Sequence, residues 1–135
     1  MLAIIPTLRY KNARAAIDWL CEAFGFEARL VVSGETDDIV THAQLVYGDG
    51  MIMLGSDRDD AYGRYITVPE QIGGRTTQAP YVVVHDPDAH YARAKAAGAT
   101  IVMDIEDQGY GGRAYSCLDP EGHLWNFGNY DPWKD

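Results

Sequence analysis

One order of predicted elements occurs twice in this chain, with corresponding residues 72 to 74 positions apart. Each copy is predicted as a strand, a helix and three further strands, from the alternation or helical spacing of its apolar residues. The matching pairs are Asn12 and Asp86, Gly25 and Gly98, Gly50 and Gly122, and Gly55 and Gly128. A near-constant offset with the same elements in the same order indicates an internal duplication.

Capping residues and turns place the elements along the chain. Asn12 is a typical N-cap and Gly25 a typical C-cap of a helix. The first copy is predicted to hold a strand over 2–10, a helix over 13–24 and strands over 26–32, 40–47 and 51–55. The second is predicted to hold a strand over 81–84, a helix over about 89–97 capped by Asp86 or Asp88, and strands over 100–105, 113–118 and 123–129. Asp119-Pro120-Glu121-Gly122 is typical of a tight turn between the last two strands.

The length of 135 residues predicts a single domain, 1–135, made of two β-α-β-β-β modules of about 1–55 and 79–130. A long loop over 56–78 joins the modules and shows no hydrophobic period. Length alone leaves two interpretations of this loop open, a lid or binding loop and a mobile linker.

Charge and composition exclude several classes of protein. The formal net charge of −9 leaves no basic stripe for phosphates, so a nucleic-acid partner is not expected. The acidic balance is compatible with a cationic small molecule, although solubility alone also explains it. The apolar fraction of 47% supports a real core, and no apolar run is long enough to span a membrane.

The N-terminal residues and the cysteines point to the cytoplasm. The start of the chain lacks the basic region and long apolar segment of a signal peptide. Cys21 and Cys117 share no metal or redox spacing, and we interpret them as buried free thiols, with a reactive thiol as the alternative.

Several segments resemble the glyoxalase / bleomycin-resistance / extradiol-dioxygenase superfamily, also called vicinal oxygen chelate proteins. The resemblance covers nearly the whole chain outside 56–78 and is closest to bleomycin-resistance-like and glyoxalase-like members. Its residues are Asn12 to Leu20 with Phe24-Gly25-Phe26, Val84 to His90 with Ala97-Gly98-Ala99, and Tyr110-Gly111-Gly112-Arg113 followed by Asp119 to Trp125.

The resemblance implies an α+β fold in which tandem βαβββ modules form a cup-shaped mixed sheet with the helices packed outside. It also implies a homodimer, with the cup completed at or near the subunit interface. In the enzymes of the superfamily, this cup holds a divalent metal bound by residues of the first and last strands of each module.

The positions that correspond to those metal ligands hold unsuitable residues. They are Ile5, Leu54 or Met53, Ala79 or Pro80, and Asn126. A divalent metal needs imidazole or carboxylate donors that converge on one point, and the four histidines do not supply them. We therefore predict no metal and no cofactor.

Successive side chains of a strand point to opposite faces of the sheet, and this alternation indicates which side chains line the cup. If Asn126 faces the cup, Trp125 and Phe127 pack against a helix, and we interpret Trp125 as core. Arg9 is expected at the rim in a salt bridge. The predicted ligand-binding residues are Thr7, His42, Gln44, Met53, Tyr110, Arg113, Tyr115 and Asn126. No catalytic residue is assigned.

Three functions stay open. The first is a non-catalytic protein, metal-free, that sequesters an aromatic or cationic compound in a resistance-type role. The second is a glyoxalase-like lyase, isomerase or dioxygenase with an altered active site that uses His42 or Tyr115 as acid or base. The third is a structural or regulatory dimer whose cup is filled by side chains.

Overall fold

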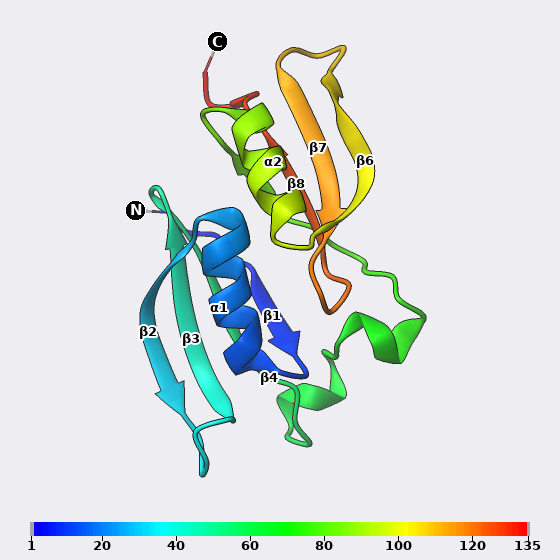
Figure 1. The fold of residues 1–135 in the computed structure, drawn as a ribbon. Coiled ribbons are helices and arrows are strands. Elements are labelled where there is room, and N and C mark those ends of the chain that lie inside the picture. The colour runs from blue at the N-terminus through cyan, green and yellow to red at the C-terminus, as the bar shows by residue number, and fades with distance from the viewer. Residues whose placement is uncertain (1, 135) are drawn as a thin grey trace.

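A computed structural model describes residues 2–134. Each half of the chain folds as a βαβββ module (Figure 1). The first module contains β1 (Thr7–Tyr10), α1 (Ala13–Phe24), β2 (Glu27–Ser33), β3 (Val40–Tyr47) and β4 (Gly50–Ser56). The second contains β5 (Tyr81–Val83), α2 (Pro87–Ala96), β6 (Thr100–Asp107), β7 (Arg113–Leu118) and β8 (Leu124–Gly128). The predicted α+β fold of repeated modules is therefore confirmed.

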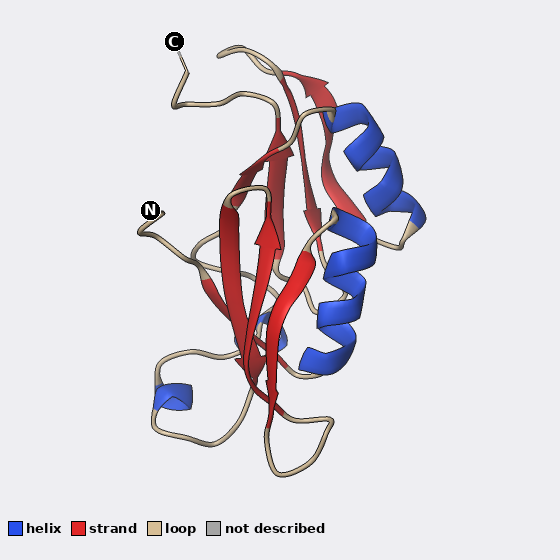
Figure 2. Cartoon of the chain, turned by 90° about the vertical axis from the view of Figure 1, so that its left-hand side faces the viewer, coloured by secondary structure: helices blue, strands red, loops and turns tan. Residues whose placement is uncertain are grey.

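The two sheets have the same topology. The first has the strand order β1-β4-β3-β2 and the second the order β5-β8-β7-β6. In each, the first and last strands of the module pair in parallel and the other pairs are antiparallel. Both helices lie on one side of the strands (Figure 2), so each sheet has one face covered by a helix and one open face.

Local sequence chemistry caps both helices at the predicted residues, and α1 has the predicted bounds. The Asn12 side chain accepts a hydrogen bond from the backbone N–H of Ala15, and the Asp86 side chain does the same for Ala89. Gly25 ends α1 with a φ of 87°, a conformation that glycine adopts without strain. Pro87 takes the first position of α2, where its missing N–H costs nothing, so this helix begins two residues earlier than predicted.

The first strand is shorter than predicted. We expected it to start at residue 2, whereas β1 starts at Thr7 and residues 2–6 have no strand assignment. Pro6 explains the boundary, because it has no N–H to donate to a ladder, although its carbonyl still accepts from Met53.

A single core runs through both modules. Phe24 at the end of α1 packs against the rings of Trp125 and Phe127 on β8, and Trp125 is fully buried as predicted. Cys117 is buried in this core, where desolvation raises the pKa of its thiol to about 12, while Cys21 is half-buried. Aromatic contacts of this kind stabilise the folded state by more than the burial of their apolar area alone.

Hydrogen bonds between the helices also join the modules. The Trp19 indole on α1 donates to the carbonyl of Ala97, at 2.8 Å. Arg93 on α2 donates from Nε to the carbonyl of Glu22 and from Nη2 to that of Cys21. The helices thus lie side by side and leave both open sheet faces directed away from them (Figures 1 and 2).

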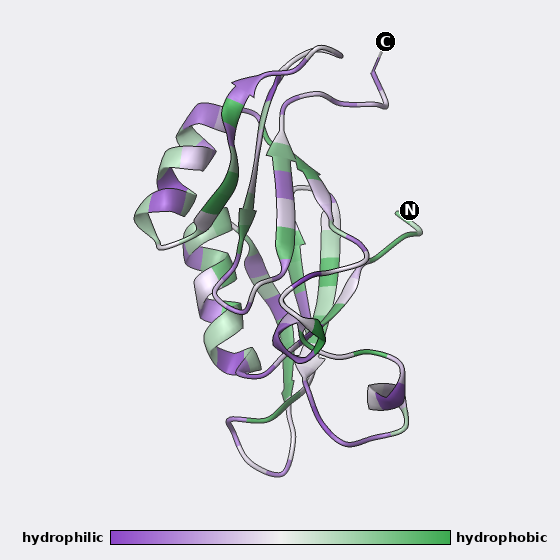
Figure 3. Cartoon of the chain, turned by 90° about the vertical axis from the view of Figure 1, so that its right-hand side faces the viewer, coloured by the Kyte–Doolittle hydropathy of each residue, from purple (hydrophilic) through white to green (hydrophobic). Residues whose placement is uncertain are grey.

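The connecting segment, residues 57–80, holds two short 3-10 helices, η1 (Tyr62–Arg64) and η2 (Pro69–Ile72). Val68 and Pro69 are buried and anchor its middle. Much of the segment is hydrophilic, in contrast to the apolar stretches along the strands (Figure 3). Among the described helices, none has the length and apolar character needed to cross a bilayer.

Candidate functional site

The open face of the first sheet brings four of the predicted ligand-binding residues together. The strand register places Thr7 beside Met53 and Met53 beside Gln44. His42 lies two residues along β3 from Gln44, on the same face, and the Gln44 amide donates to its Nε2 at 3.1 Å. Thr7 is exposed and the other three are half-buried.

The same row recurs on the second sheet. Register places Tyr81 beside Asn126 and Asn126 beside Ser116, which repeats the row of Thr7, Met53 and Gln44. The sequence left Leu54 and Met53 open as the position that corresponds to the last-strand metal ligand of the first module. In the structure, Leu54 is buried on the helix side and Met53 occupies the open face, so Met53 is that position.

The residues at these positions do not fit a divalent metal. Met53 offers only a thioether, and Asn126 is already engaged: its Oδ1 accepts from Ser116 at 2.6 Å and its Nδ2 donates to the carbonyl of Pro80 at 3.2 Å. Within residues 2–134, three or more His, Cys, Asp or Glu side chains nowhere form a group that could hold an ion. Although His42 lies on the open face of the first sheet, the described residues of the open faces do not supply a converging group of the donors that the superfamily's metal chemistry requires.

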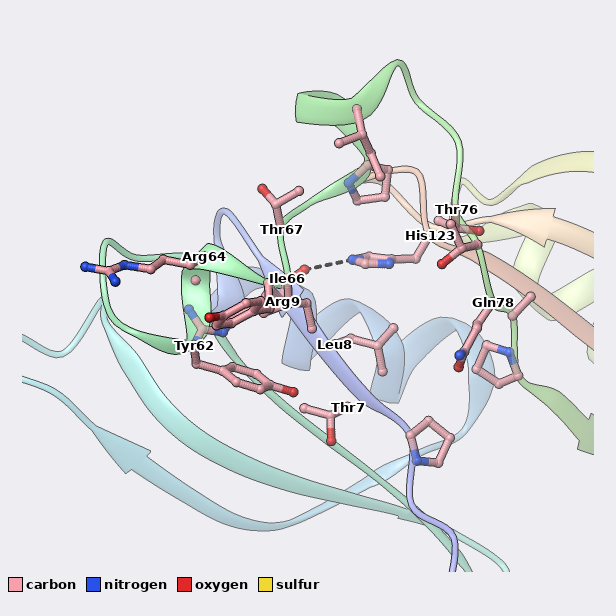
Figure 4. A pocket seen from close by; sticks show the side chains of 18 residues that line it. Thr7, Leu8, Arg9, Tyr62, Arg64, Ile66, Thr67, Thr76, Gln78 and His123 are labelled. Carbon is pink, nitrogen blue, oxygen red and sulfur yellow. Dashed lines mark hydrogen bonds between the residues drawn. The ribbon is translucent and has the colours of Figure 1, made fainter.

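A pocket of about 740 Å³ lies between β1, the connecting segment and the turn before β8. Thr7 and Arg9 contribute from β1, while Tyr62 and Tyr65 contribute from η1 and its end (Figure 4). The remaining lining residues are Pro6, Leu8, Gly63, Arg64, Ile66, Thr67, Pro69, Ile72, Thr76, Thr77, Gln78, Ala79, Pro80 and His123. Hydroxyl, amide and aromatic groups thus alternate with apolar side chains around the pocket.

Arg9 is buried in the wall of this pocket, with 5% of its surface exposed, so the expected exposed rim position was wrong, whereas the expected salt bridge is present. Its guanidinium donates to the carbonyl of Ser56 at 3.2 Å and to both carboxylate oxygens of Asp60, at 3.1 and 3.3 Å. Burial is tolerated because the charge is paired and hydrogen-bonded. The backbone N–H of Gly63 and the Arg9 guanidinium lower the pKa of Asp60.

Two further contacts hold the pocket wall. The Arg9 guanidinium lies over the Tyr62 ring, 5.2 Å from its centroid. His123 Nε2 donates to the Arg9 carbonyl at 2.7 Å, shown as the dashed line in Figure 4. These contacts connect β1, η1 and the turn before β8, so the wall is built from both modules and the segment between them.

Two predicted ligand-binding residues lie elsewhere. Tyr115 is on the helix-covered face of β7, with 1% exposure, and its hydroxyl contacts His90 Nδ1 at 2.6 Å. Tyr115 is therefore a core residue turned away from the open face, and its desolvation raises the pKa of its hydroxyl. Arg113 is at the outer end of the same face, paired with Asp88 and Asp107. Face assignment failed here because alternation alone does not say which face a helix covers.

Tyr110 lies at the far end of the second sheet. Its ring stands edge-on to that of Tyr130 at 5.0 Å, and the Tyr81 hydroxyl donates to the Tyr130 carbonyl at 2.7 Å. This exposed tyrosine cluster is close to the open face of the second module but does not line the pocket beside β1.

Sequence reasoning missed the pocket residues of the connecting segment. Tyr62, Tyr65 and Thr67 lie in a stretch without a hydrophobic period, so neither helical nor strand patterning singles them out. Tyr62 and Tyr65, close in sequence to Arg58 and Asp60, were the available signal for a binding site, but the sequence left a binding loop and a mobile linker both open.

Comparisons with known proteins agree with this geometry. An uncharacterised protein of Mycobacterium tuberculosis H37Rv is 35% identical over 126 residues, which cover 93% of this chain and 73% of that protein. The crystal structure of TioX from Micromonospora sp. ML1 is also 35% identical, with a TM-score of 0.73 and 94% of each chain covered.

A more distant structure has the same fold. The bleomycin resistance determinant encoded on transposon Tn5 has a TM-score of 0.68 at 18% identity, covering 97% of this chain and 99% of that one. The family model of the Glyoxalase/Bleomycin resistance protein/Dioxygenase superfamily matches residues 4–127. With its repeated βαβββ modules, the chain belongs to the glyoxalase/bleomycin resistance/dioxygenase superfamily.

Proposed function

We propose that this chain is a metal-free small-molecule binding protein that sequesters its ligand without converting it. The observation that carries the proposal is the pocket of about 740 Å³ beside β1, in a chain whose metal positions hold Met53 on the first sheet and Asn126 on the second. The volume falls within the usual range for small-molecule sites, about 300–1,000 Å³. Tyrosine rings and threonine hydroxyls suit an aromatic ligand with hydrogen-bonding substituents.

Calorimetric titration with a library of aromatic compounds tests the proposal. We expect binding at one site per chain, with the ligand recovered chemically unchanged. Thr7 is exposed on β1 and lines the pocket, so Thr7→Trp should fill it and abolish binding. Thr100→Trp is the matched control, because Thr100 is an exposed strand residue outside the pocket. Equal binding by the two variants would contradict this location for the site.

The competing function is an enzyme of the superfamily with an altered site. The hydrogen bond from Gln44 to His42 Nε2 favours it, because this contact orients an imidazole on the open face and leaves the proton on Nδ1. Stoichiometric metal in the purified protein, together with turnover lost on chelation and in His42→Gln, would replace the binding proposal with this one.

The same proposal includes a cytoplasmic homodimer with a role in antibiotic resistance. Exposed apolar side chains on the open edges and faces of both sheets support self-association, including Leu30, Val32, Val102 and Met103. Sensitivity of a host strain to aromatic antibiotics, with and without expression of the chain, tests the resistance role. Unchanged sensitivity to every compound that binds the purified protein would contradict it.

A further inference from the structure

The pocket beside β1 has a charge balance opposite to that of the whole chain. The chain carries 20 Asp and Glu against 11 Lys and Arg, yet none of the described residues that line the pocket is acidic. Arg9, Arg64 and His123 are its basic lining residues. The carboxylates gather elsewhere: Glu70 and Glu121 line a separate open groove on the other side of the turn at Pro120.

Arg9 changes the charge preference of the Tyr62 ring, so that this aromatic surface of the pocket does not favour cations. The ring face of tyrosine attracts positive charge through its electron density. In this protein one face of the Tyr62 ring is already covered by the Arg9 guanidinium, at 5.2 Å. A second cation stacked on the other face would be repelled by Arg9, a repulsion that the paired Asp60 carboxylate reduces, whereas an electron-rich or anionic ring would be attracted.

Arg64 adds a second positive charge at the outer edge of the pocket. Its side chain points outward from the rim (Figure 4), and its guanidinium lies within ion-pair distance of no acidic side chain among residues 2–134. The hydroxyls of Thr67, Thr76 and Thr77 add hydrogen-bond donors for an acceptor group. The Asp60 carboxylate, which is paired with Arg9, opposes the positive potential.

From this arrangement we infer that the ligand of the pocket is an aromatic anion, such as an aromatic carboxylate, and not a cation. The inference rests on the proposed binding function and replaces the expectation of a cationic ligand that the acidic composition had suggested. The composition describes the whole surface, whereas recognition depends on the few charges next to the ligand.

Three probes of one shape and different charge test the inference: 2-naphthoate, 2-naphthamide and 2-naphthylmethylammonium, titrated at pH 7.5 and low salt. We expect the anion to bind about threefold more tightly than the amide, and the cation more weakly than either. Binding of the cation as tightly as the anion, or equal binding of all three, would overturn the inference.

Charge variants provide a second readout that does not depend on the pocket's shape. Asp60→Asn keeps an acceptor for Arg9 and Gly63 but leaves the charges of Arg9 and Arg58 uncompensated, so the affinity for 2-naphthoate should rise about threefold. Asp59→Asn changes the net charge equally at an exposed neighbour and should have a much smaller effect. Equal responses of the two variants would also overturn the inference.

The outcomes separate the inference from the proposed function. If 2-naphthamide binds wild type but not Thr7→Trp while the charge series is flat, the pocket is a binding site and the anion preference is wrong. If none of the three probes binds the wild-type protein and the aromatic library also fails, both the proposed function and the inference fall.

Discussion

The Tyr10 hydroxyl donates a 2.6 Å hydrogen bond to Oδ2 of Asp119, a residue 109 positions later in the chain. The same oxygen accepts from the Trp125 indole at 3.0 Å, and Oδ1 accepts from the backbone N–H groups of Glu121 and His123. The buried carboxylate is thus satisfied by four donors from both modules. Desolvation and the Asp119 charge together raise the pKa of Tyr10 well above its usual value.

Replacement of Asp119 should therefore be the most destabilising change at the junction of the modules. We expect Asp119→Ala to lower the free energy of unfolding by about 3–5 kcal/mol, because several buried donors lose their acceptor. Tyr10→Phe removes one donor and should cost about 1–2 kcal/mol. Urea denaturation measures both, and similar losses in the two variants would contradict the role given to the carboxylate.

Gly122 makes the turn before β8 sensitive to any side chain. Its φ is 88°, and a Cβ would meet only Pro69, at an ordinary 3.5 Å, so the expected cost is one of backbone conformation. We expect Gly122→Ala to lower thermal stability by an amount equivalent to about 1–2 kcal/mol. Gly109→Ala is the control, since Gly109 does not have a positive φ and has no neighbour within 4 Å; its melting temperature should stay unchanged or rise slightly.

His90 should make stability depend on pH. Its Nε2 donates to the Phe24 carbonyl at 2.8 Å, and burial lowers its pKa below the usual 6.5, with a further contribution from the Arg93 charge. The neutral ring is therefore the folded form. Its stabilising effect is complete above pH 6.5 and is lost as the pH falls from 6.5 toward the folded-state pKa, because the unfolded chain takes up the proton first.

The measurement compares wild type with His90→Gln. Between pH 7 and 5.5, the difference in unfolding free energy between the two proteins should change by about 1 kcal/mol in favour of the variant. Carboxylates and the other histidines titrate in both proteins, so they cancel. Parallel pH profiles would show that His90 is not held neutral in the folded state.

The proposed dimer predicts that one added charge on an open sheet separates the protomers. Met103 on β6 is exposed and belongs to the apolar surface of the second sheet. We expect Met103→Glu to shift the mass measured by light scattering toward the monomer. Ala92→Glu adds the same charge on the outer side of α2 and should leave the mass unchanged. A monomeric wild-type protein would contradict the proposal outright.

Most of the fold could be predicted from local patterns. Asn12, Gly25 and Gly122 act within a few residues of themselves, so their roles are visible in sequence, and the duplication supplied a second reading of each element. Alternation grouped Thr7, Met53 and Gln44 as candidates for the cup, and the strand register of the structure places them in one row.

The rest depends on contacts between distant positions. Asp60, the partner of Arg9, is distant from it in sequence, and no residue near Arg9 indicates this ion pair. The burial of Arg9 therefore could not be predicted, because arginine usually lies at the surface. Tyr115 was misplaced because alternation groups residues by face without saying which face is covered. The part of the connecting segment that lines the pocket has no hydrophobic period in its sequence. Only the folded chain brings Tyr62 next to β1.

The bonds that join the two modules do not pass through the segment that links them covalently. Trp19 reaches Ala97, Arg93 reaches Glu22, and Tyr10 reaches Asp119, all outside residues 57–80. A cut at the Gly73-Gly74 peptide bond, between exposed residues, leaves these three hydrogen bonds between the modules intact. We therefore expect two polypeptides that end and begin there to reassemble, which would make this fold suited to fragment complementation.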